Sequence, residues 1–289
     1  MKRILAILLA CVLCLGAFAQ ELTVGSYNIR YKNKGDSIKG NAWARRCQSM
    51  CNQIKWERPD IFGAQEVLHA QLMDLEAGLG GYRWIGVGRD DGKQAGEYAA
   101  IFYNPRRVEL LDQGHFWLNE TPDRPALGWD AACIRICTWG HFRDRQTQKD
   151  FYFLNLHMDH VGVKARSESA RLVMQRITQM TQGGKKLAVL TGDFNVPQTD
   201  ELYRLFADSG VLKDCYTSAE WRFAENGTYN AFDTQRYIPE RIDHIFVTPT
   251  TAVEAYAVRT DGHWLPDKSG TMQRRNISDH YPVFARIHF

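Results

Sequence analysis

The sequence lacks the large excess of one charge that proteins tracking a nucleic-acid backbone usually carry. It has 36 Lys and Arg against 33 Asp and Glu, whereas neutralisation of phosphates by basic side chains supplies much of the affinity of such proteins. It also lacks a linker-like Pro/Ser/Gly tract and an apolar run of the roughly 18 residues that a membrane-spanning helix needs. These absences argue against long duplex DNA as the ligand and favour one folded domain.

Cysteine is too sparse for a disulfide scaffold. Of the seven cysteines, Cys11 and Cys14 lie in the first 19 residues, and the other five are Cys47, Cys51, Cys133, Cys137 and Cys215. Two pairs of these are spaced by four residues, which is not the spacing of a C-x-x-C redox or zinc motif. We expect most of them to be plain buried residues, and one or two disulfides stay open.

The first 19 residues have the pattern of a secretory signal peptide. Lys2 and Arg3 precede a nearly continuous apolar segment over residues 4–18, and residues 17–19 form a small-x-small cleavage site. We therefore expect export to the periplasm or the medium after cleavage near Ala19, which leaves a single domain over residues 20–289 with a formal charge of +1. A lipoprotein modified at Cys11 is the less favoured alternative, because its apolar segment would be short.

Short apolar runs interleave with helical patterns along the rest of the chain. Residues 43–55 predict a helix with Arg45, Arg46, Gln48 and Gln53 on its water-facing side, and residues 163–180 carry an apolar stripe. The expected strands are residues 22–27, 61–64, 98–103, 134–139, 151–156, 187–190, 242–247 and 283–287. This alternation predicts one layered α/β domain with helices on the outside.

Polar side chains that can hold a metal ion or a phosphate lie at the ends of several of these strands. They are Asn28, Glu66, His157, Asp193 with Asn195, Asp243, and Asp279 with His280. Ligands of open α/β sheets tend to bind off the strand ends. The set therefore predicts one convergent site.

Each of these residues also has a structural explanation. Asp193 and Asn195 would suit a turn, Glu66 a helix cap and Asp279 a surface loop. Asp243 is different, because an ionised carboxylate inside an apolar strand needs a partner such as an imidazole. Their joint occurrence favours a functional site.

The set and its order resemble the endonuclease/exonuclease/phosphatase superfamily of metal-dependent hydrolases, which includes DNase I and deadenylases. The resemblance runs from residues 26–30 (SYNIR) to residues 278–280 (SDH), and residues 192–195 (GDFN) are among its most specific parts. Residues 155–166 are similar to an exported bacterial subgroup related to the deadenylase-like branch. The resemblance implies a DNase I-like fold of the α/β (α+β) class, a four-layer sandwich of two mostly antiparallel β-sheets flanked by helices.

The same resemblance implies a metal site and a reaction. Glu66, helped by Asn28, would bind Mg²⁺ or Mn²⁺, with Asp279 beside the ion or at a second position. The implied reaction is metal-assisted in-line attack of water on a phosphoester, most readily a phosphodiester, without a covalent intermediate.

Five residues receive catalytic roles from the resemblance. Asp193 would orient or deprotonate the attacking water, and Asn195 would hold the water or the phosphoryl oxygens. His157 and His280 would flank the phosphorus and stabilise its developing charge. Asp243 would fix the tautomer of His280 and keep it protonated.

Further candidates for substrate contacts are His160, Arg166, Glu97, Tyr229 and Asn230. Arg166 would either reach a phosphate or cap the helix that begins near residue 163. Glu97 would orient His157 or merely lie at a strand edge. Tyr229 and Asn230 belong to a segment that is either a substrate loop or a turn.

Three other functions stay open. A phosphomonoesterase acting on inositol or sugar phosphates would use the same catalytic set, which reports the phosphoryl chemistry and not the leaving group. A dinuclear zinc hydrolase would use His157, Asp159 and His160. These residues match the H-x-H-x-D-H zinc signature except that Asn155 stands in place of its first histidine. A catalytically silent exported binding protein would show a gap in the set, and none is found.

The expected partner is a phosphate-ester substrate: a nucleotide, nucleic acid, lipid head group or sugar phosphate. No stable protein partner is implied, so we expect a monomer.

Overall fold

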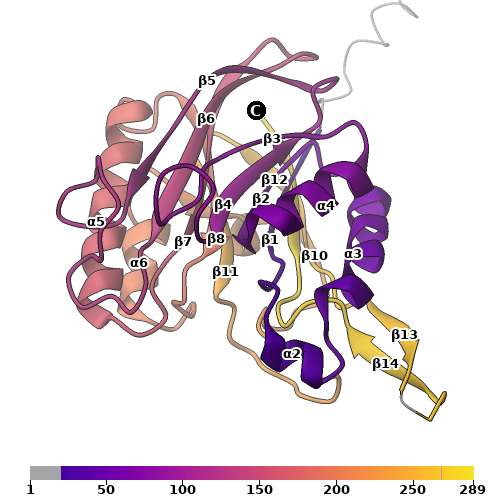
Figure 1. The fold of residues 1–289 in the computed structure, drawn as a ribbon. Helices are drawn as coiled ribbons and strands as arrows, with labels where there is room; N and C mark the ends of the chain where they lie inside the picture. Colours follow the sequence, from indigo (N-terminus) through magenta and orange to yellow (C-terminus); the bar gives the residue numbers. More distant parts are fainter. Residues whose placement is uncertain (1–20, 268) are drawn as a thin grey trace, which may run out of the picture.

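The computed structural model describes residues 21–267 and 269–289, so the predicted signal peptide lies outside the described residues. Two large β-sheets pack face to face, and helices cover both outer sides (Figure 1). This arrangement confirms the predicted four-layer sandwich. Among the described strand pairs, β1–β2, β7–β8 and β10–β12 are parallel and the others are antiparallel, as expected for mostly antiparallel sheets.

The first sheet has the strand order β10-β12-β15-β1-β2-β4-β3. Its strands are β1 (Leu22–Asn28), β2 (Ile61–Val67), β3 (Arg83–Ile85), β4 (Tyr98–Tyr103), β10 (Trp221–Phe223), β12 (Ala252–Val258) and β15 (Val283–His288). The second sheet has the order β5-β6-β7-β8-β11-β9. Its strands are β5 (Val108–Trp117), β6 (Ile136–Asp144), β7 (Asp150–His157), β8 (Leu187–Asp193), β9 (Lys213–Asp214) and β11 (Asp243–Val247). A separate hairpin consists of β13 (Gly262–Pro266) and β14 (Met272–Asn276).

The longer helices bury apolar side chains against the outer faces of the sheets. Their bounds are α2 (Lys34–Ile38), α3 (Trp43–Glu57), α4 (His69–Leu79), α5 (Val163–Met180), α6 (Glu201–Ala207) and α7 (Cys215–Ser218). Helices α3 and α4 pack on the first sheet, and α5 and α6 pack on the second. Helix α5 has the predicted bounds. Within the described part of the chain, no helix combines the length and apolarity of a membrane span.

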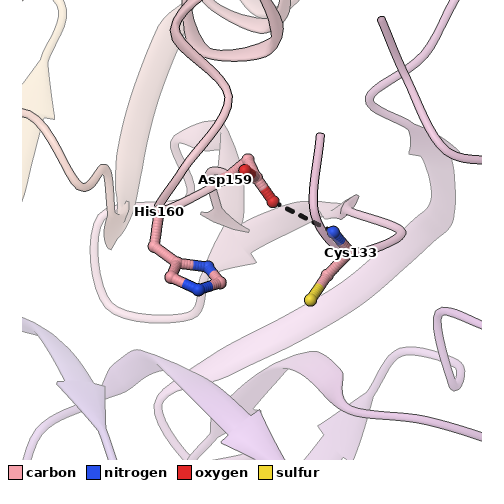
Figure 2. Close-up of side chains that lie close together, drawn as sticks. All are labelled: Cys133, Asp159 and His160. Atoms are coloured by element: carbon pink, nitrogen blue, oxygen red, sulfur yellow. Dashed lines mark hydrogen bonds between the residues drawn. The ribbon is translucent and has the colours of Figure 1, made fainter. Parts of the chain in front are cut away.

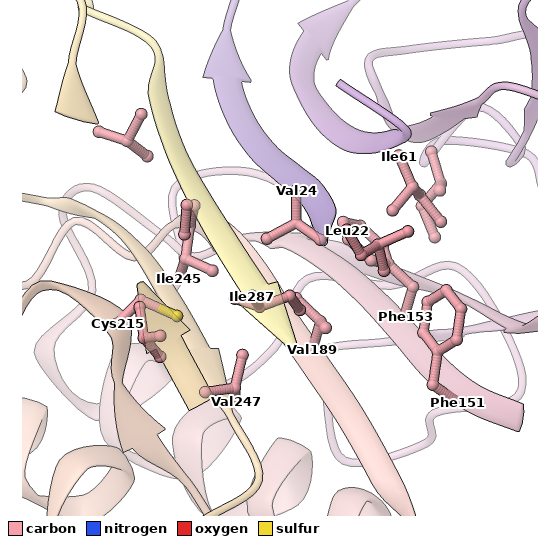
Figure 3. Packing of buried hydrophobic residues seen from close by; sticks show 14 of the residues in the cluster. Leu22, Val24, Ile61, Phe151, Phe153, Val189, Cys215, Ile245, Val247 and Ile287 are labelled. Atoms are coloured by element: carbon pink, nitrogen blue, oxygen red, sulfur yellow. The ribbon is translucent and has the colours of Figure 1, made fainter. Parts of the chain in front are cut away.

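Apolar side chains from both sheets fill the space between them (Figure 3). Val24 and Ile61 come from the first sheet, whereas Phe153, Val189 and Ile245 come from the second, and each is fully buried. Burial of such side chains stabilises the fold by about 1.5–3 kcal/mol each. This core fixes how the strand ends of one sheet face those of the other.

The side of α3 that we predicted to face water is partly buried. Arg46 is 1% exposed, and its guanidinium donates hydrogen bonds to the carbonyl oxygens of Ile29 and Ile277, both at 2.9 Å. Gln53 is also buried and accepts a hydrogen bond from the hydroxyl of Tyr27. The prediction was wrong because backbone carbonyls at the end of β1 and before β15 need donors, and a planar guanidinium can serve several of them.

The five cysteines in the described part of the chain are free thiols. Cys51, Cys137 and Cys215 are buried, and Cys47 and Cys133 are half-buried. This agrees with the expectation that most are plain buried residues.

Strand direction and register bring the predicted site residues to one edge. Strands β7 and β8 run parallel, and β11 runs antiparallel to β8. In this register, His157 is the cross-strand partner of Asp193, and Asp193 is the partner of Asp243. Three residues far apart in sequence therefore form one row across the second sheet.

Candidate active site

A cleft of about 540 Å³ opens at this edge of the sandwich. Nine of the predicted site residues line it: Glu66, Glu97, His157, His160, Asp193, Asn195, Tyr229, Asp279 and His280. Asn28 and Asp243 are fully buried behind them, where each bonds to a lining residue. The structure thus brings most of the predicted set together.

Asp193 is the carboxylate on which the polar side chains of the cleft converge. One of its oxygens, Oδ2, lies 3.0 Å from Nδ2 of Asn28, 3.4 Å from Nε2 of His157 and 3.7 Å from Nε2 of His280. Burial, together with the charge of Asp243, raises the pKa of Asp193 to about 7. A carboxylate with this pKa is suited to accept a proton near neutral pH.

His280 forms a buried ion pair with Asp243. Its Nδ1 lies 2.8 Å from Oδ2 of Asp243. Burial opposes the positive charge, but the carboxylates of Asp243 and Asp193 outweigh it and raise the pKa of His280 to about 10. The imidazole is therefore protonated at neutral pH, with its Nε2 directed toward Asp193.

His157 has the opposite electrostatic environment. Burial and the positive charges of Arg135 and Arg89 lower its pKa well below the ordinary value, so the imidazole is neutral. Its Nδ1 has no hydrogen-bond partner among the described residues. Of the two alternatives for Glu97, orientation of His157 is not observed. Both carboxylate oxygens of Glu97 accept from Arg89 at 2.6 and 3.2 Å, and a guanidinium binds a carboxylate more strongly than a neutral imidazole does.

Glu66 reaches the cleft through an irregularity in β2. The register between β2 and β4 shifts between Ala64 and Val67, and Glu66 has a φ of 60°. A bulge of this kind redirects a side chain, and a left-handed non-glycine residue is an uncommon conformation that tends to occur at functional sites. The Glu66 carboxylate accepts hydrogen bonds from Asn28 Nδ2 at 3.0 Å and from the backbone N–H of Tyr31 at 3.1 Å.

The residues around Glu66 fit a divalent cation. Burial and the charge of Glu66 raise the pKa of Asp279, and the guanidinium of Arg30 lies 3.8 Å from Glu66 and 3.5 Å from Asp279. Two carboxylates that share a buried site attract positive charge, and oxygen ligands suit Mg²⁺ and Mn²⁺. Oδ1 of Asn28 accepts a hydrogen bond from the backbone N–H of Arg30. Its amide nitrogen bridges Glu66 and Asp193, so Asn28 holds these two carboxylates in place.

Glu66→Gln is expected to raise the concentration of Mg²⁺ or Mn²⁺ needed for half-maximal activity by at least about tenfold, because an amide is a weaker ligand than a carboxylate. The measurement is a metal titration of phosphoester hydrolysis after removal of metal with EDTA. Glu76→Gln, which makes the same change at an exposed position of α4, is the control. An unaltered titration for Glu66→Gln would remove Glu66 from the metal site.

Comparison with known proteins identifies the family. A model of the endonuclease/exonuclease/phosphatase family matches residues 25–280, which covers all of the candidate catalytic residues. The chain belongs to the endonuclease/exonuclease/phosphatase family. This confirms the predicted family and, with it, the predicted class of phosphoesterase.

Several known proteins are similar to this chain. A mannosyl-6-phosphatase from Bacteroides thetaiotaomicron is 46% identical, with a TM-score of 0.90, covering 93% of this chain and 100% of that one. A family protein from Bacteroides vulgatus is 40% identical, with a TM-score of 0.82, covering 93% and 99%. An uncharacterized protein of Acanthamoeba polyphaga mimivirus is 29% identical over 160 residues. The matched region covers 53% of this chain and 59% of that curated relative.

Two of the predicted substrate contacts do not line the cleft of this family member. Arg166 donates to the carbonyl oxygen of Asp159, so it braces the loop before α5. Asn230 is 1% exposed, and its Oδ1 accepts from the backbone N–H of Phe232 and from the side-chain amide of Asn276. Asn230 thus stabilises a turn, which was the structural alternative for its segment. Arg166 neither lines the cleft nor caps α5, because its guanidinium binds the loop before that helix.

The hydrogen bonds of Asp159 weigh against the zinc alternative, although Cys133, Asp159 and His160 lie close enough together to share a metal ion. Figure 2 shows this carboxylate beside Cys133 and His160. It accepts hydrogen bonds from the backbone N–H groups of Ala132, Cys133, Val161 and Gly162 and from Nε of Arg135. Although burial opposes ionisation, these bonds lower the pKa of Asp159 to about 2. Because the two oxygens of Asp159 already accept five hydrogen bonds from the surrounding loop and Arg135, they are poor candidates for metal ligands.

Arg30, Arg89 and Arg135 also line the cleft, and the sequence analysis assigned a role to none of them. Arg135 directly precedes β6, inside the apolar run 134–139, and is 4% exposed. The reasoning applied to Asp243, that a charge embedded in an apolar strand needs a partner, would have found it. Arg89 lies in a glycine-rich loop before β4 whose composition gives no such signal.

Proposed function

We propose that the chain hydrolyses phosphoesters by direct attack of water on phosphorus. Asp193 accepts the proton of the water, and the His280 imidazolium stabilises the charge that develops on the phosphoryl oxygens. His157, being neutral, lies 3.4 Å from the same oxygen of Asp193 and adds no second positive charge there. The proposal rests on the different protonation states of three neighbouring side chains. Asp193, with a pKa of about 7, lies close to the cationic imidazole of His280 and to the neutral imidazole of His157.

We propose Mg²⁺ or Mn²⁺ as the cofactor, held by Glu66 and Asp279. A divalent ion there would supply positive charge to the phosphoryl oxygens. Asn28 keeps Glu66 and Asp193 in place, since its amide nitrogen lies 3.0 Å from each carboxylate.

Among the phosphoesters, we propose monoesters of small molecules as the substrates. The sequence motifs favoured a phosphodiester and left a monoester open. Support for the monoester comes from the 46% identity to a mannosyl-6-phosphatase over 93% of the chain and from a cleft of about 540 Å³, which lies within the range typical of small-molecule sites.

The test is hydrolysis of p-nitrophenyl phosphate and bis(p-nitrophenyl) phosphate by purified residues 20–289, with mannose 6-phosphate as a sugar substrate. The protein is first stripped with EDTA and then supplied separately with Mg²⁺, Mn²⁺ or Zn²⁺. Monoester turnover restored by Mg²⁺ or Mn²⁺ is the expected result. Preference for the diester would restore the first prediction, activity with Zn²⁺ alone would contradict the cofactor, and inactivity on all three substrates would favour a binding protein.

We also propose that the enzyme is exported as a single domain of residues 20–289. This proposal rests on the charged, apolar and small-x-small pattern of residues 2–19. N-terminal sequencing of the protein recovered outside the cytoplasm should begin at Gln20, whereas an intact Met1 or a lipidated Cys11 would contradict it.

A further inference from the structure

One side of the cleft is not used by the proposed reaction. It is formed by Arg89, Glu97, Arg135 and His160, here named the distal wall. Arg89, Glu97 and Arg135 adjoin His157 around a small cavity that extends from the cleft. Three residues of the distal wall therefore adjoin His157, which in turn lies 3.4 Å from Asp193.

Arg89 and Glu97 form a forked ion pair in this wall. The two terminal nitrogens of Arg89 lie 2.6 and 3.2 Å from the two oxygens of Glu97. The side chains are 13% and 15% exposed, so each retains a face toward the cleft. Nε of Arg89 is buried and lies 3.8 Å from Oδ1 of Asp90. The pair therefore presents the carboxylate lone pairs of Glu97 to the cleft.

Arg135 and His160 form the other half of the distal wall. Nε of Arg135 lies 3.3 Å from Asp159, and its Nη2 lies 2.9 Å from Nδ1 of His160. A guanidinium can only donate, so Nδ1 of His160 accepts and the ring proton is on Nε2. His160 is exposed beside Cys133 (Figure 2), and its Nε2–H is available as a donor.

The loop that carries Arg89 is held in place before any ligand binds. The carbonyl oxygen of Arg89 accepts from Trp117 Nε1 at 2.7 Å, and its N–H donates to the carbonyl oxygen of Glu97 at 3.1 Å. A further backbone bond joins Asp90 to Ala95 at 3.1 Å. Such preorganisation reduces the cost of ordering a recognition surface on binding.

We propose that the distal wall binds the leaving group and that this group is a neutral sugar, recognised through its hydroxyls. Each arginine is neutralised by its own carboxylate, Glu97 or Asp159, so the wall has no spare positive charge for a second phosphate. A hydroxyl donates and accepts at once, which matches a wall that offers both the carboxylate of Glu97 and the N–H of His160.

A nucleoside fits the distal wall less well. Bases are usually bound by stacking on aromatic side chains. Among the described residues that line the cleft, the Phe, Tyr and Trp side chains are those of Tyr31 and Tyr229. The backbone of Tyr31 bonds to Glu66, and the ring of Tyr229 lies 5.0 Å from that of His280. Both belong to the metal-binding side and not to the distal wall.

The inference rests on the proposed function, and Glu97→Gln tests it separately. The change keeps the volume of the side chain but removes the charge that balances Arg89. We expect kcat/KM for mannose 6-phosphate to fall about tenfold or more relative to that for p-nitrophenyl phosphate, which has no hydroxyls, mainly through KM. Because Arg89 is then unbalanced, the ratio of kcat/KM for a hexose 1,6-bisphosphate to that for the 6-phosphate should rise.

Two further variants complete the test. Arg89→Lys keeps the positive charge but cannot donate two parallel hydrogen bonds to Glu97. It should also lower the selectivity for the sugar phosphate. Glu76→Gln on α4 is the matched control and should leave both ratios unchanged. Hydrolysis of p-nitrophenyl phosphate by the Glu97 and Arg89 variants shows that they are folded.

Two kcat/KM ratios decide the test: mannose 6-phosphate to p-nitrophenyl phosphate, and hexose 1,6-bisphosphate to the 6-phosphate. The inference is overturned if both ratios are the same in Glu97→Gln as in the wild type. It is equally overturned if the wild type prefers AMP or the bisphosphate over mannose 6-phosphate by more than about tenfold. Absence of wild-type hydrolysis of p-nitrophenyl phosphate with every metal would instead contradict the proposed function itself.

Discussion

Replacing Asp193 by asparagine is expected to reduce turnover by about 10²–10⁴-fold, the range of general acid–base contributions. Asparagine has nearly the same volume and can still accept a hydrogen bond from Asn28, but it cannot take a proton from water. The same change removes one of two carboxylates that face each other across β8 and β11, Asp193 and Asp243. We therefore expect the melting temperature of the metal-free protein to rise while activity falls, as is common for strained active-site groups.

The size of this stabilisation should depend on pH in a definite direction. The folded-state pKa of Asp193, about 7, lies above the ordinary value of 3.8. The cost of ionising it in the folded protein is therefore absent below pH 4, grows between pH 4 and 7, and is complete above pH 7. The difference in melting temperature between Asp193→Asn and wild type, measured in EDTA, should be larger at pH 8 than at pH 5. Wild-type turnover in the variant would remove Asp193 from the reaction.

The sequence predicted which residues meet at one edge of the sandwich, because strand ends are local features. His157, Asp193 and Asp243 each follow or begin a readable apolar run, and their meeting then depends only on strand order and register. What could not be predicted is side-chain direction where the backbone is irregular. Glu66 faces the cleft through a bulge, and Asn230 turns away from it because Asn276, 46 residues later, binds its oxygen.

The fold shows the same division between local and distant causes. Strand β4 and helix α5 have the predicted bounds because their apolar periodicity is strong. Strand β14 contains Gln273, Arg274 and Arg275 and is largely exposed, so no apolar pattern indicates it. Arg46 was placed in water because its role depends on carbonyl oxygens of residues 29 and 277, which no pattern within α3 can reveal.

Replacing His280 by glutamine is expected to reduce turnover by about 10²–10³-fold, because it removes a preorganised positive charge beside the reacting phosphoryl group. It should also destabilise the protein. Asp243 is 0% exposed, its Oδ1 has no partner among the described residues, and its Oδ2 would lose His280. Removing one partner of a buried ion pair costs about 3–5 kcal/mol, which for a chain of this size corresponds to a fall in melting temperature on the order of 10 °C.

The double variant Asp243→Asn/His280→Gln separates these two effects. Asparagine and glutamine can share a hydrogen bond without a buried charge, so the melting temperature should return toward that of wild type. Turnover should remain as low as in His280→Gln, because neither amide restores the positive charge next to Asp193. Recovery of both stability and turnover would mean that the single variant loses activity through unfolding, and His280 would then be a structural partner of Asp243. Recovery of stability alone assigns the imidazolium to the reaction.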